Sequence, residues 1–264
     1  MKIVFLGDIV GRPGRETVAK FLPNVKEKYS PDLIIANAEN ISHGNGFSPD
    51  AIKEMMNLGV NFFTTGDHAW DNKKGASKLD DKDFPVIRPA NYPPKNVPGR
   101  GYDIVADASG HKVLVINLIG RVFIKKDFDC PFRKLDEILE ETKNENLSGI
   151  LVDLHAEATS EKYAMGFYAD GRVSAVVGTH THVPTRDLRT LENGTAYISD
   201  IGMTGSLDSV IGVKKDIILH SFLTQLPVKH EVEDHGTMVF NAVVIELDEK
   251  TRKALNVEYV QYFN

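Results

Sequence analysis

The sequence predicts a mixed α/β fold in one domain over residues 1–264. Short apolar runs alternate with amphipathic stretches along the chain. The first three apolar runs and the two stretches between them form a βαβαβ pattern, which implies parallel strands joined by crossover helices. No internal repeat, low-complexity segment or linker interrupts the sequence, so one domain is the simplest interpretation. A chain of 264 residues, 42% of them hydrophobic, can bury a core without disulfides.

Three strands and two helices are expected in the first quarter of the chain. They are strands over 2–6, 32–38 and 61–65, each a short apolar run, and helices over 14–29 and 49–58. Ser48 is an N-cap for the second helix, Pro49 occupies its first position, and Gly59 ends it. Pro23 lies inside the first helix and is expected to kink or split it.

The remaining chain is expected to add further strands and helices joined by tight turns. A β-hairpin over 101–106 and 112–118 turns at 108–111, and Asn193-Gly194 joins two more short strands. The other expected elements are helices over 132–146, 161–168 and 214–223, strands over 150–154 and 173–177, and two strands within 237–262.

Composition excludes several classes of protein. Lys and Arg number 31 and Asp and Glu number 37, so the formal net charge is −6 and no basic surface for extended nucleic acid or a membrane is expected. No apolar run reaches the length of about 18 residues that suggests a transmembrane helix, and Asp8 interrupts the N-terminal apolar run too early for a signal peptide. The single Cys130 cannot form an internal disulfide, which fits a reducing compartment. We therefore expect a cytoplasmic protein.

Five of the expected strands end in side chains that can bind metal. These side chains are Asp8, Glu39, Asn40, Asp67, His68, His155, His180 and His182. Each one alone is readily explained as a turn former or a core residue, but their placement at successive strand ends is not. Ligands of open α/β sheets bind outside the carboxyl ends of the strands, and His180 and His182 should point to one side of an extended segment. Carboxylates, an amide oxygen and imidazoles suit Mn, Fe, Co or Zn, whereas the absence of thiolates argues against a closed structural zinc site.

Longer stretches around these residues carry a family resemblance. They are GDIVGRPGR (7–15), NAENISHGNG (37–46), VIRPANYP (86–93), DLHAEATSEK (153–162), VVGTHTHVPT (176–185) and SDIGMTG (199–205). Together they resemble the calcineurin-like metallophosphoesterases, and more closely the bacterial YmdB-like branch of cyclic-nucleotide phosphodiesterases. The resemblance implies a four-layer α-β-β-α sandwich of two mixed sheets flanked by helices.

The resemblance also implies two transition-metal ions per chain, with iron or manganese expected and zinc or cobalt as alternatives. The implied ligands of the first ion are Asp8, Glu39 and His182, and those of the second are Glu39, Asn40, Asp67, His155 and His180. Glu39 would bridge the two ions, and His68 would be the catalytic acid near the leaving group.

Two positions depart from the family pattern. The wider superfamily has a histidine where this chain has Val10, a loss that the YmdB-like branch shares. That branch normally has asparagine where this chain has Asp67. With Asp67, three carboxylates and a bridging hydroxide would balance the charge of two divalent ions. With asparagine at this position, the site would keep one positive charge. We hypothesise that Asp67 strengthens metal binding, or favours one trivalent ion, and weakens the attraction of an anionic substrate.

The function expected from these features is hydrolysis of small phosphodiesters. The resemblance points to cyclic nucleotides, both 2′,3′-cyclic and 3′,5′-cyclic, attacked by a metal-bridging hydroxide while His68 acts as general acid. The alternatives are a metal-dependent phosphomonoesterase or nucleotidase, and a weakly active regulatory scaffold. The resemblance further suggests a homo-oligomer, a dimer or larger.

Three other residues have open roles. Arg121 could pair with a substrate phosphate or form a surface salt bridge. His43 could line the pocket beside Asn40. Trp70 is better explained by core packing than by stacking on a base.

Overall fold

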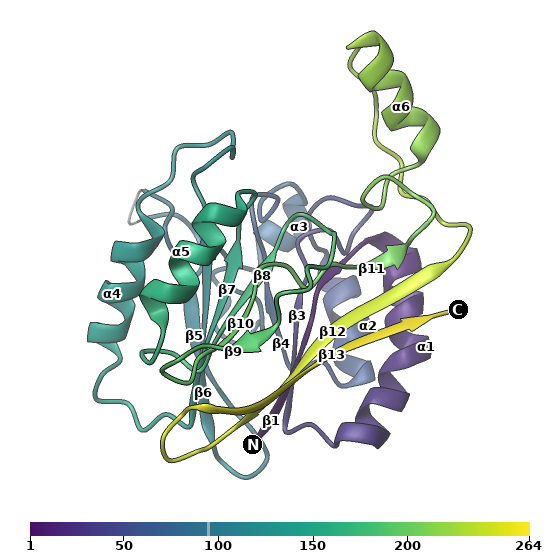
Figure 1. Cartoon of the computed structure of the whole chain (residues 1–264). Helices are drawn as coiled ribbons and strands as arrows, with labels where there is room; N and C mark the ends of the chain where they lie inside the picture. The colour runs from purple at the N-terminus through teal and green to yellow at the C-terminus, as the bar shows by residue number, and fades with distance from the viewer. Residues whose placement is uncertain (94–95) are drawn as a thin grey trace.

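Two β-sheets pack face to face, and helices cover the outer face of each, which makes four layers (Figure 1). The computed structural model describes residues 1–93 and 96–264. This arrangement confirms the expected α-β-β-α sandwich.

The first sheet has seven strands in the order β2-β11-β12-β1-β3-β4, with β13 paired to β12. Its strands are β1 (Lys2–Leu6), β2 (Asp8–Ile9), β3 (Leu33–Asn37), β4 (Phe62–Thr64), β11 (Met203–Ser206), β12 (Met238–Leu247) and β13 (Ala254–Phe263). Strands β1, β3 and β4 are parallel neighbours, as the βαβαβ pattern predicts, and β12 is antiparallel to β1.

The second sheet has six strands in the order β5-β6-β7-β8-β10-β9. Its strands are β5 (Tyr102–Ala106), β6 (Lys112–Ile119), β7 (Gly149–His155), β8 (Ala175–Thr179), β9 (Arg189–Thr190) and β10 (Ala196–Ile198). Strands β6, β7, β8 and β10 run parallel, while the β5–β6 hairpin and the β9–β10 pair are antiparallel as expected.

The helices are divided between the two outer faces. They are α1 (Gly11–Tyr29), α2 (Pro49–Leu58), α3 (Lys73–Ala76), α4 (Pro131–Glu141), α5 (Thr159–Ala169) and α6 (Lys215–Thr224). Helices α1 and α2 cover the first sheet and α4 and α5 the second, whereas α6 projects away from the body (Figure 1). No helix in the described ranges has both the length and the apolar character that crossing a membrane requires.

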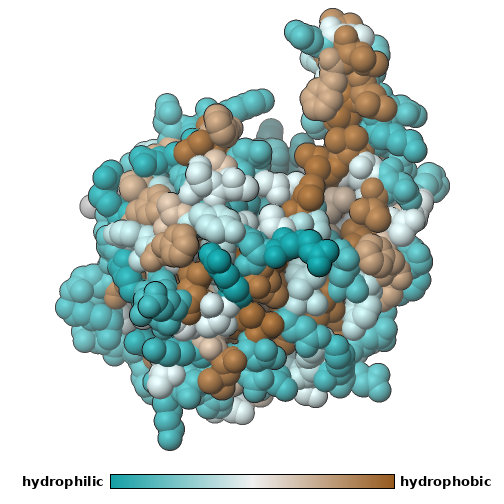
Figure 2. All heavy atoms as spheres, in the orientation of Figure 1, coloured by the Kyte–Doolittle hydropathy of each residue, from teal (hydrophilic) through white to brown (hydrophobic). Residues whose placement is uncertain are grey.

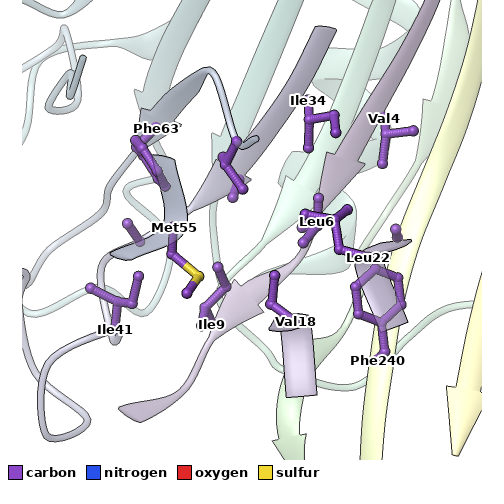
Figure 3. Close-up of a cluster of buried hydrophobic side chains, with 14 of the residues drawn as sticks. Val4, Leu6, Ile9, Val18, Leu22, Ile34, Ile41, Met55, Phe63 and Phe240 are labelled. Atoms are coloured by element: carbon purple, nitrogen blue, oxygen red, sulfur yellow. The ribbon is translucent and has the colours of Figure 1, made fainter. Parts of the chain in front are cut away.

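Alternation along β1 shows how one strand serves two cores. Val4 and Leu6 join the cluster under α1 and α2 (Figure 3), while Ile3 and Phe5 join the cluster between the two sheets. Side chains of a strand point alternately to its two faces. Both faces of β1 are covered, so its residues from Ile3 to Leu6 are all buried and apolar. This burial explains the continuous apolar run from which the strand was predicted.

Helix boundaries test the capping signals directly. The Ser48 side chain accepts a hydrogen bond from the Ala51 backbone N–H at 3.2 Å, and Gly59 closes α2 in a left-handed conformation, both as predicted. The expected split at Pro23 is wrong, because α1 is one helix from Gly11 to Tyr29. The buried face around Pro23 includes Leu22 and Val25, and its packing outweighs the one hydrogen bond that a proline removes.

The elements that the sequence analysis did not predict are all short. They are β2, β11 and α3. Strands β2 and β11 pair in parallel, with Met203 opposite Asp8 and Thr204 opposite Ile9. Two-residue pairings of this kind depend on tertiary contacts between distant segments, so local periodicity contains no signal for them.

Candidate metal centre

The metal-binding candidates lie where parallel strands of both sheets end. Asp8 follows β1, Glu39 and Asn40 follow β3, and Asp67 follows β4. From the second sheet, His155 is the last residue of β7, and His180 and His182 follow β8. The backbone N–H of His180 donates to Asp8 Oδ2 at 3.3 Å, so the two sheets meet at this edge.

Four of the side chains form one compact cluster. Glu39, Asp67, His155 and His180 each offer a ligand atom, and these atoms lie within 4.8 Å of one another. The Nε2 atom of His155 is 3.1 Å from Glu39 Oε2 and 3.4 Å from Asp67 Oδ1, and it is 3.0 Å from His180 Nδ1. All four belong to the set expected around the second ion.

A second group lies next to this cluster. His182 Nε2 is 3.8 Å from Asp8 Oδ1 and 3.1 Å from Asn40 Nδ2, and Asn40 also donates to Glu39 Oε1 at 3.0 Å. The Nδ1–H of His182 donates to the Ile211 carbonyl at 2.7 Å, which leaves Nε2 free to act as a ligand atom. The structure thus brings all seven expected ligand residues together at one edge.

The backbone of the two histidines after β8 differs from the expectation of an extended segment. The φ angles of His180 and His182 are 98° and 66°, in the left-handed region that side chains rarely adopt. The extended-segment reasoning is therefore wrong, although both side chains still reach the edge. Strain of this kind persists only where surrounding contacts hold it.

The residues at this edge fit bound cations. The buried oxygens Asp8 Oδ1 and Asp67 Oδ1 accept no hydrogen bond within the described part of the chain, which is costly for a carboxylate unless a cation lies against it. At Gly66 an added Cβ would lie 2.1 Å from Glu39 Oε2. Any residue other than glycine would therefore clash with the Glu39 carboxylate in its present position. Oxygen and imidazole donors without thiolates suit Mn, Fe, Co or Zn.

Burial and the neighbouring charges shift the pKa values of several side chains at this edge. Burial raises the pKa of Asp8 to about 6, and burial together with the charge of His155 lowers the pKa of His180 to about 4. Burial acts to lower the pKa of His155, but the negative charge of Glu39 and the contacts with the Asp67 and Glu39 carboxylates together outweigh burial and raise that pKa well above its ordinary value. A proton on His155 therefore supplies part of the positive charge that the carboxylates require.

His68 lies beside the ligands rather than among them. Its Nδ1–H donates to Asp71 Oδ2 at 2.7 Å, and its side chain is one-third exposed. Burial opposes a rise in its pKa, but the charges of Glu39 and Asp67 outweigh burial and raise it. His68 also lines a cavity of about 350 Å³ together with Glu39, Asn40, His180 and His182.

The three residues with open roles are placed as follows. Trp70 makes an edge contact with Tyr92, with ring centroids 4.4 Å apart. It packs against the core, which is the role that the sequence favoured over stacking on a base. His43 lines a different cavity, of about 470 Å³, with Arg12 and His230. Arg121 is exposed, and its backbone N–H donates to the Glu161 carboxylate at 3.0 Å.

Sequence reasoning missed the buried polar residues beneath the ligands. Lys162 Nζ donates to Asp200 Oδ2 at 2.6 Å and to the Thr179 carbonyl at 2.8 Å, and all three residues are buried. Asp153 is buried within β7. A charged residue inside an otherwise apolar strand was a signal that could have drawn attention to Asp153.

Comparison with known proteins places this fold and site in a family. The family model described as "YmdB-like protein" matches residues 4–260. A Bacillus subtilis protein named 2′,3′-cyclic-nucleotide 2′-phosphodiesterase is 44% identical over 260 residues, which cover 98% of this chain and 96% of that protein.

The chain belongs to the YmdB-like family.

Solved structures agree with this assignment. The crystal structure of a phosphatase from Mycoplasma pneumoniae aligns with a TM-score of 0.92 at 34% identity and covers 100% of the YmdB-like chain and 93% of its own. A 5′-nucleotidase structure from Staphylococcus aureus, at 16% identity, aligns with a TM-score of 0.62, covering 98% of this chain and 54% of its own, which shows a shared fold. The YmdB-like chain thus has a metallophosphoesterase-type fold with a cluster of metal-binding residues at its strand ends.

Proposed function

We propose that this protein is a two-metal phosphodiesterase that hydrolyses small phosphodiesters, with nucleoside 2′,3′-cyclic phosphates as the leading substrates and 3′,5′-cyclic nucleotides as further ones. The observation that carries the proposal is the convergence of seven oxygen and imidazole ligand residues at one edge, beside a cavity that His68 also lines. The name of the Bacillus subtilis relative supports the choice of substrate.

The seven expected ligand residues would be shared between two ions. We assign the first ion to Asp8, Glu39 and His182, and the second to Glu39, Asn40, Asp67, His155 and His180. Glu39 lies between the two sets, since its Oε2 faces His155 while its Oε1 accepts from Asn40, whose Nδ2 atom is also 3.1 Å from His182 Nε2. Iron or manganese is proposed for both positions, with zinc or cobalt as substitutes.

Residues around the ions would perform the remaining steps. When bound, two ions would supply a hydroxide nucleophile near neutral pH and neutralise charge on the phosphoryl oxygens. Because Nδ1 of His68 is held by Asp71, Nε2 is the atom left to give a proton to the leaving oxygen. The raised pKa of His68 keeps that proton available near neutral pH.

The cavity beside the ligands favours a diester with a sizeable organic group. Much of its remaining lining is apolar, and the residues of this apolar side are Val10, Val210, Ile211, Val213, Ile218, Phe222 and Val232. Val10 occupies the position where the wider superfamily has a metal-binding histidine, so the loss of that ligand enlarges the apolar side. A nucleoside could lie against this side while its phosphate meets the ligands.

The deciding experiment combines metal analysis with hydrolysis assays. We expect about two transition-metal ions per chain and chelator-sensitive hydrolysis of adenosine 2′,3′-cyclic phosphate and bis-p-nitrophenyl phosphate. Faster hydrolysis of p-nitrophenyl phosphate would establish a phosphomonoesterase instead. Two bound ions without turnover of any of these would establish a regulatory scaffold.

A histidine variant tests the acid directly. His68→Asn should lower kcat by about 10²–10⁴ and leave the metal content unchanged, because His68 donates a proton without being needed as a ligand. His43→Asn, which alters a histidine that does not line the cavity beside the ligands, should leave kcat unchanged. Loss of metal from His68→Asn would show that this residue is a ligand.

We further propose a cytoplasmic location and self-association. The buried single thiol of Cys130 fits a reducing compartment. Helix α6 leaves Leu219, Phe222 and Leu223 exposed, and Figure 2 shows hydrophobic residues gathered over this projection. Sedimentation analysis of the metal-loaded protein should give a dimer or larger species, and a monomer at all concentrations would contradict self-association.

A further inference from the structure

A buried carboxylate that plays no part in the proposed chemistry lies directly beneath the ligands. Asp153, in β7, is fully buried, and no lysine or arginine pairs with it in the described ranges. Instead it accepts hydrogen bonds from Asn37 Nδ2 at 3.0 Å, Thr64 Oγ1 at 2.5 Å and Thr179 Oγ1 at 2.7 Å. These donors belong to β3, β4 and β8, so one carboxylate joins strand ends from both sheets.

The hydrogen bond from Thr179 to Asp153 determines which atom donates in the next hydrogen bond, between Thr179 and His155. The Thr179 hydroxyl gives its only proton to Asp153, so its oxygen can act toward a further neighbour only as an acceptor. That neighbour is His155 Nδ1, at 2.9 Å. His155 must therefore carry a proton on Nδ1 to make this contact.

The consequence appears at the other nitrogen of the same ring. With Nδ1–H held by Thr179, the Nε2 atom faces Glu39 Oε2 at 3.1 Å and Asp67 Oδ1 at 3.4 Å. A neutral imidazole protonated at Nδ1 presents its lone pair at Nε2, which is the form that can ligate a metal there.

We infer that Asp153 and Thr179 are positioning residues that hold His155 in the tautomer and ring orientation needed for metal binding. The inference rests on the proposed function through the ligand role of His155. The same carboxylate reaches a second ligand residue as well, because Asn37 donates to Asp153 and accepts from the Glu39 backbone N–H at 3.0 Å. A hydrogen bond from a ligand histidine to such a partner typically changes metal affinity by about 10–100-fold.

The test replaces the Thr179 hydroxyl by a methyl group of similar size. Thr179→Val should weaken zinc binding by about 10–100-fold in a chelator competition titration. Thr179→Ser keeps the hydroxyl and should restore the wild-type affinity. The matched control is Thr17→Val in helix α1, which removes a buried hydroxyl that donates to the Pro13 carbonyl at 2.7 Å and to none of the expected ligand residues. This control should bind zinc like the wild type.

The titration separates this inference from the proposed function. Wild-type protein that binds no metal would contradict the proposed function. Wild-type and Thr179→Val proteins that bind zinc equally would contradict only the positioning role. Equal weakening in Thr179→Val and Thr17→Val would show that loss of any buried hydroxyl suffices, and this too would overturn the inference.

A second measurement needs no variant and holds even if Thr179→Val does not fold. In zinc-loaded wild-type protein, ¹⁵N NMR of the His155 ring should show a protonated Nδ1 and a zinc-bound Nε2. Zinc bound at Nδ1, or an Nδ1 without a proton, would overturn the inference.

Discussion

At the scale of single residues, Asp67 is the expected ligand for which the family resemblance predicts an asparagine. Its Oδ1 atom is buried, accepts no hydrogen bond in the described part of the chain and lies 3.4 Å from His155 Nε2. Burial opposes a fall in its pKa, but the close contact with His155 and the positive charge of that ring outweigh burial and lower it. The carboxylate is therefore ionised at neutral pH and adds negative charge to the ligand set.

Asp67→Asn tests the effect of that charge. We expect the variant to bind metal more weakly and to show a lower KM for phosphodiesters, because it removes one negative charge from the site. Metal retention during dialysis against chelator and steady-state kinetics measure the two effects. Asp136→Asn removes a negative charge from the surface and serves as the control. Unchanged metal retention and KM in Asp67→Asn would contradict the hypothesis.

The proton on His155 predicts a pH dependence of metal binding. Since the pKa of His155 lies well above its ordinary value, the metal-free protein holds this proton at neutral pH. A metal ion needs the neutral ring, so binding should release the proton, and affinity should rise as pH rises toward that pKa. Calorimetry in buffers of different ionisation enthalpy measures the number of protons released. Proton uptake, or an affinity that falls between pH 6 and about pH 8, would contradict this assignment.

Sequence patterns predicted the convergence of the ligand candidates at one edge better than the residues that support them. Asp8, Glu39 and His155 could be recognised from the sequence, because polar residues at the ends of apolar strands are conspicuous. Thr179 was not, because a threonine in a strand has an ordinary explanation in β-propensity. Its role depends on which side chains face it from another strand, and no local pattern encodes that.

At the scale of secondary-structure elements, α6 connects a projecting surface with the cavity. Ile218 and Phe222 line the cavity beside His182, although Phe222 is 77% exposed. The helix was predicted within one residue of its bounds, but its projection from the body was not. Amphipathic periodicity indicates that a helix forms without showing whether it packs on its own chain.

Phe222→Ala tests whether α6 contributes to substrate binding. We expect a KM several-fold higher for adenosine 2′,3′-cyclic phosphate, with little change for ribose 2′,3′-cyclic phosphate, because only the first has a base to pack against an apolar residue. Leu223→Ala is the control, since Leu223 is exposed on the same helix without lining the cavity. Equal KM changes for both substrates would argue against contact with the base.

At the scale of the whole molecule, the core between the sheets argues for one folding unit. This core draws Ile3 and Phe5 from the first strand, Val115 and Leu151 from the second sheet, and Ile245 from β12. We therefore propose that residues 1–264 form one domain, as the absence of linkers predicts. The two-sheet architecture itself came from family resemblance, because periodicity cannot assign strands to separate sheets.

Thermal unfolding tests both the single domain and the metal. We expect one cooperative transition, and chelation should lower its midpoint on the order of 5–10 °C, because a ligand at about 100 times its Kd stabilises the native state by about 2.7 kcal/mol. Differential scanning calorimetry with and without chelator measures this. Two separate transitions in the metal-loaded protein would contradict the single domain.

The chain order of the ligands has a consequence for synthesis. Asp8 meets the backbone of His180, a residue 172 positions later, and β1 pairs on one side with β12, near the end of the chain. A ribosome translating this message therefore exposes the early carboxylates long before their histidine partners exist. On the proposed ligand set, chains truncated before His182 would lack a complete centre, so metal loading would have to wait until most of the protein has been made.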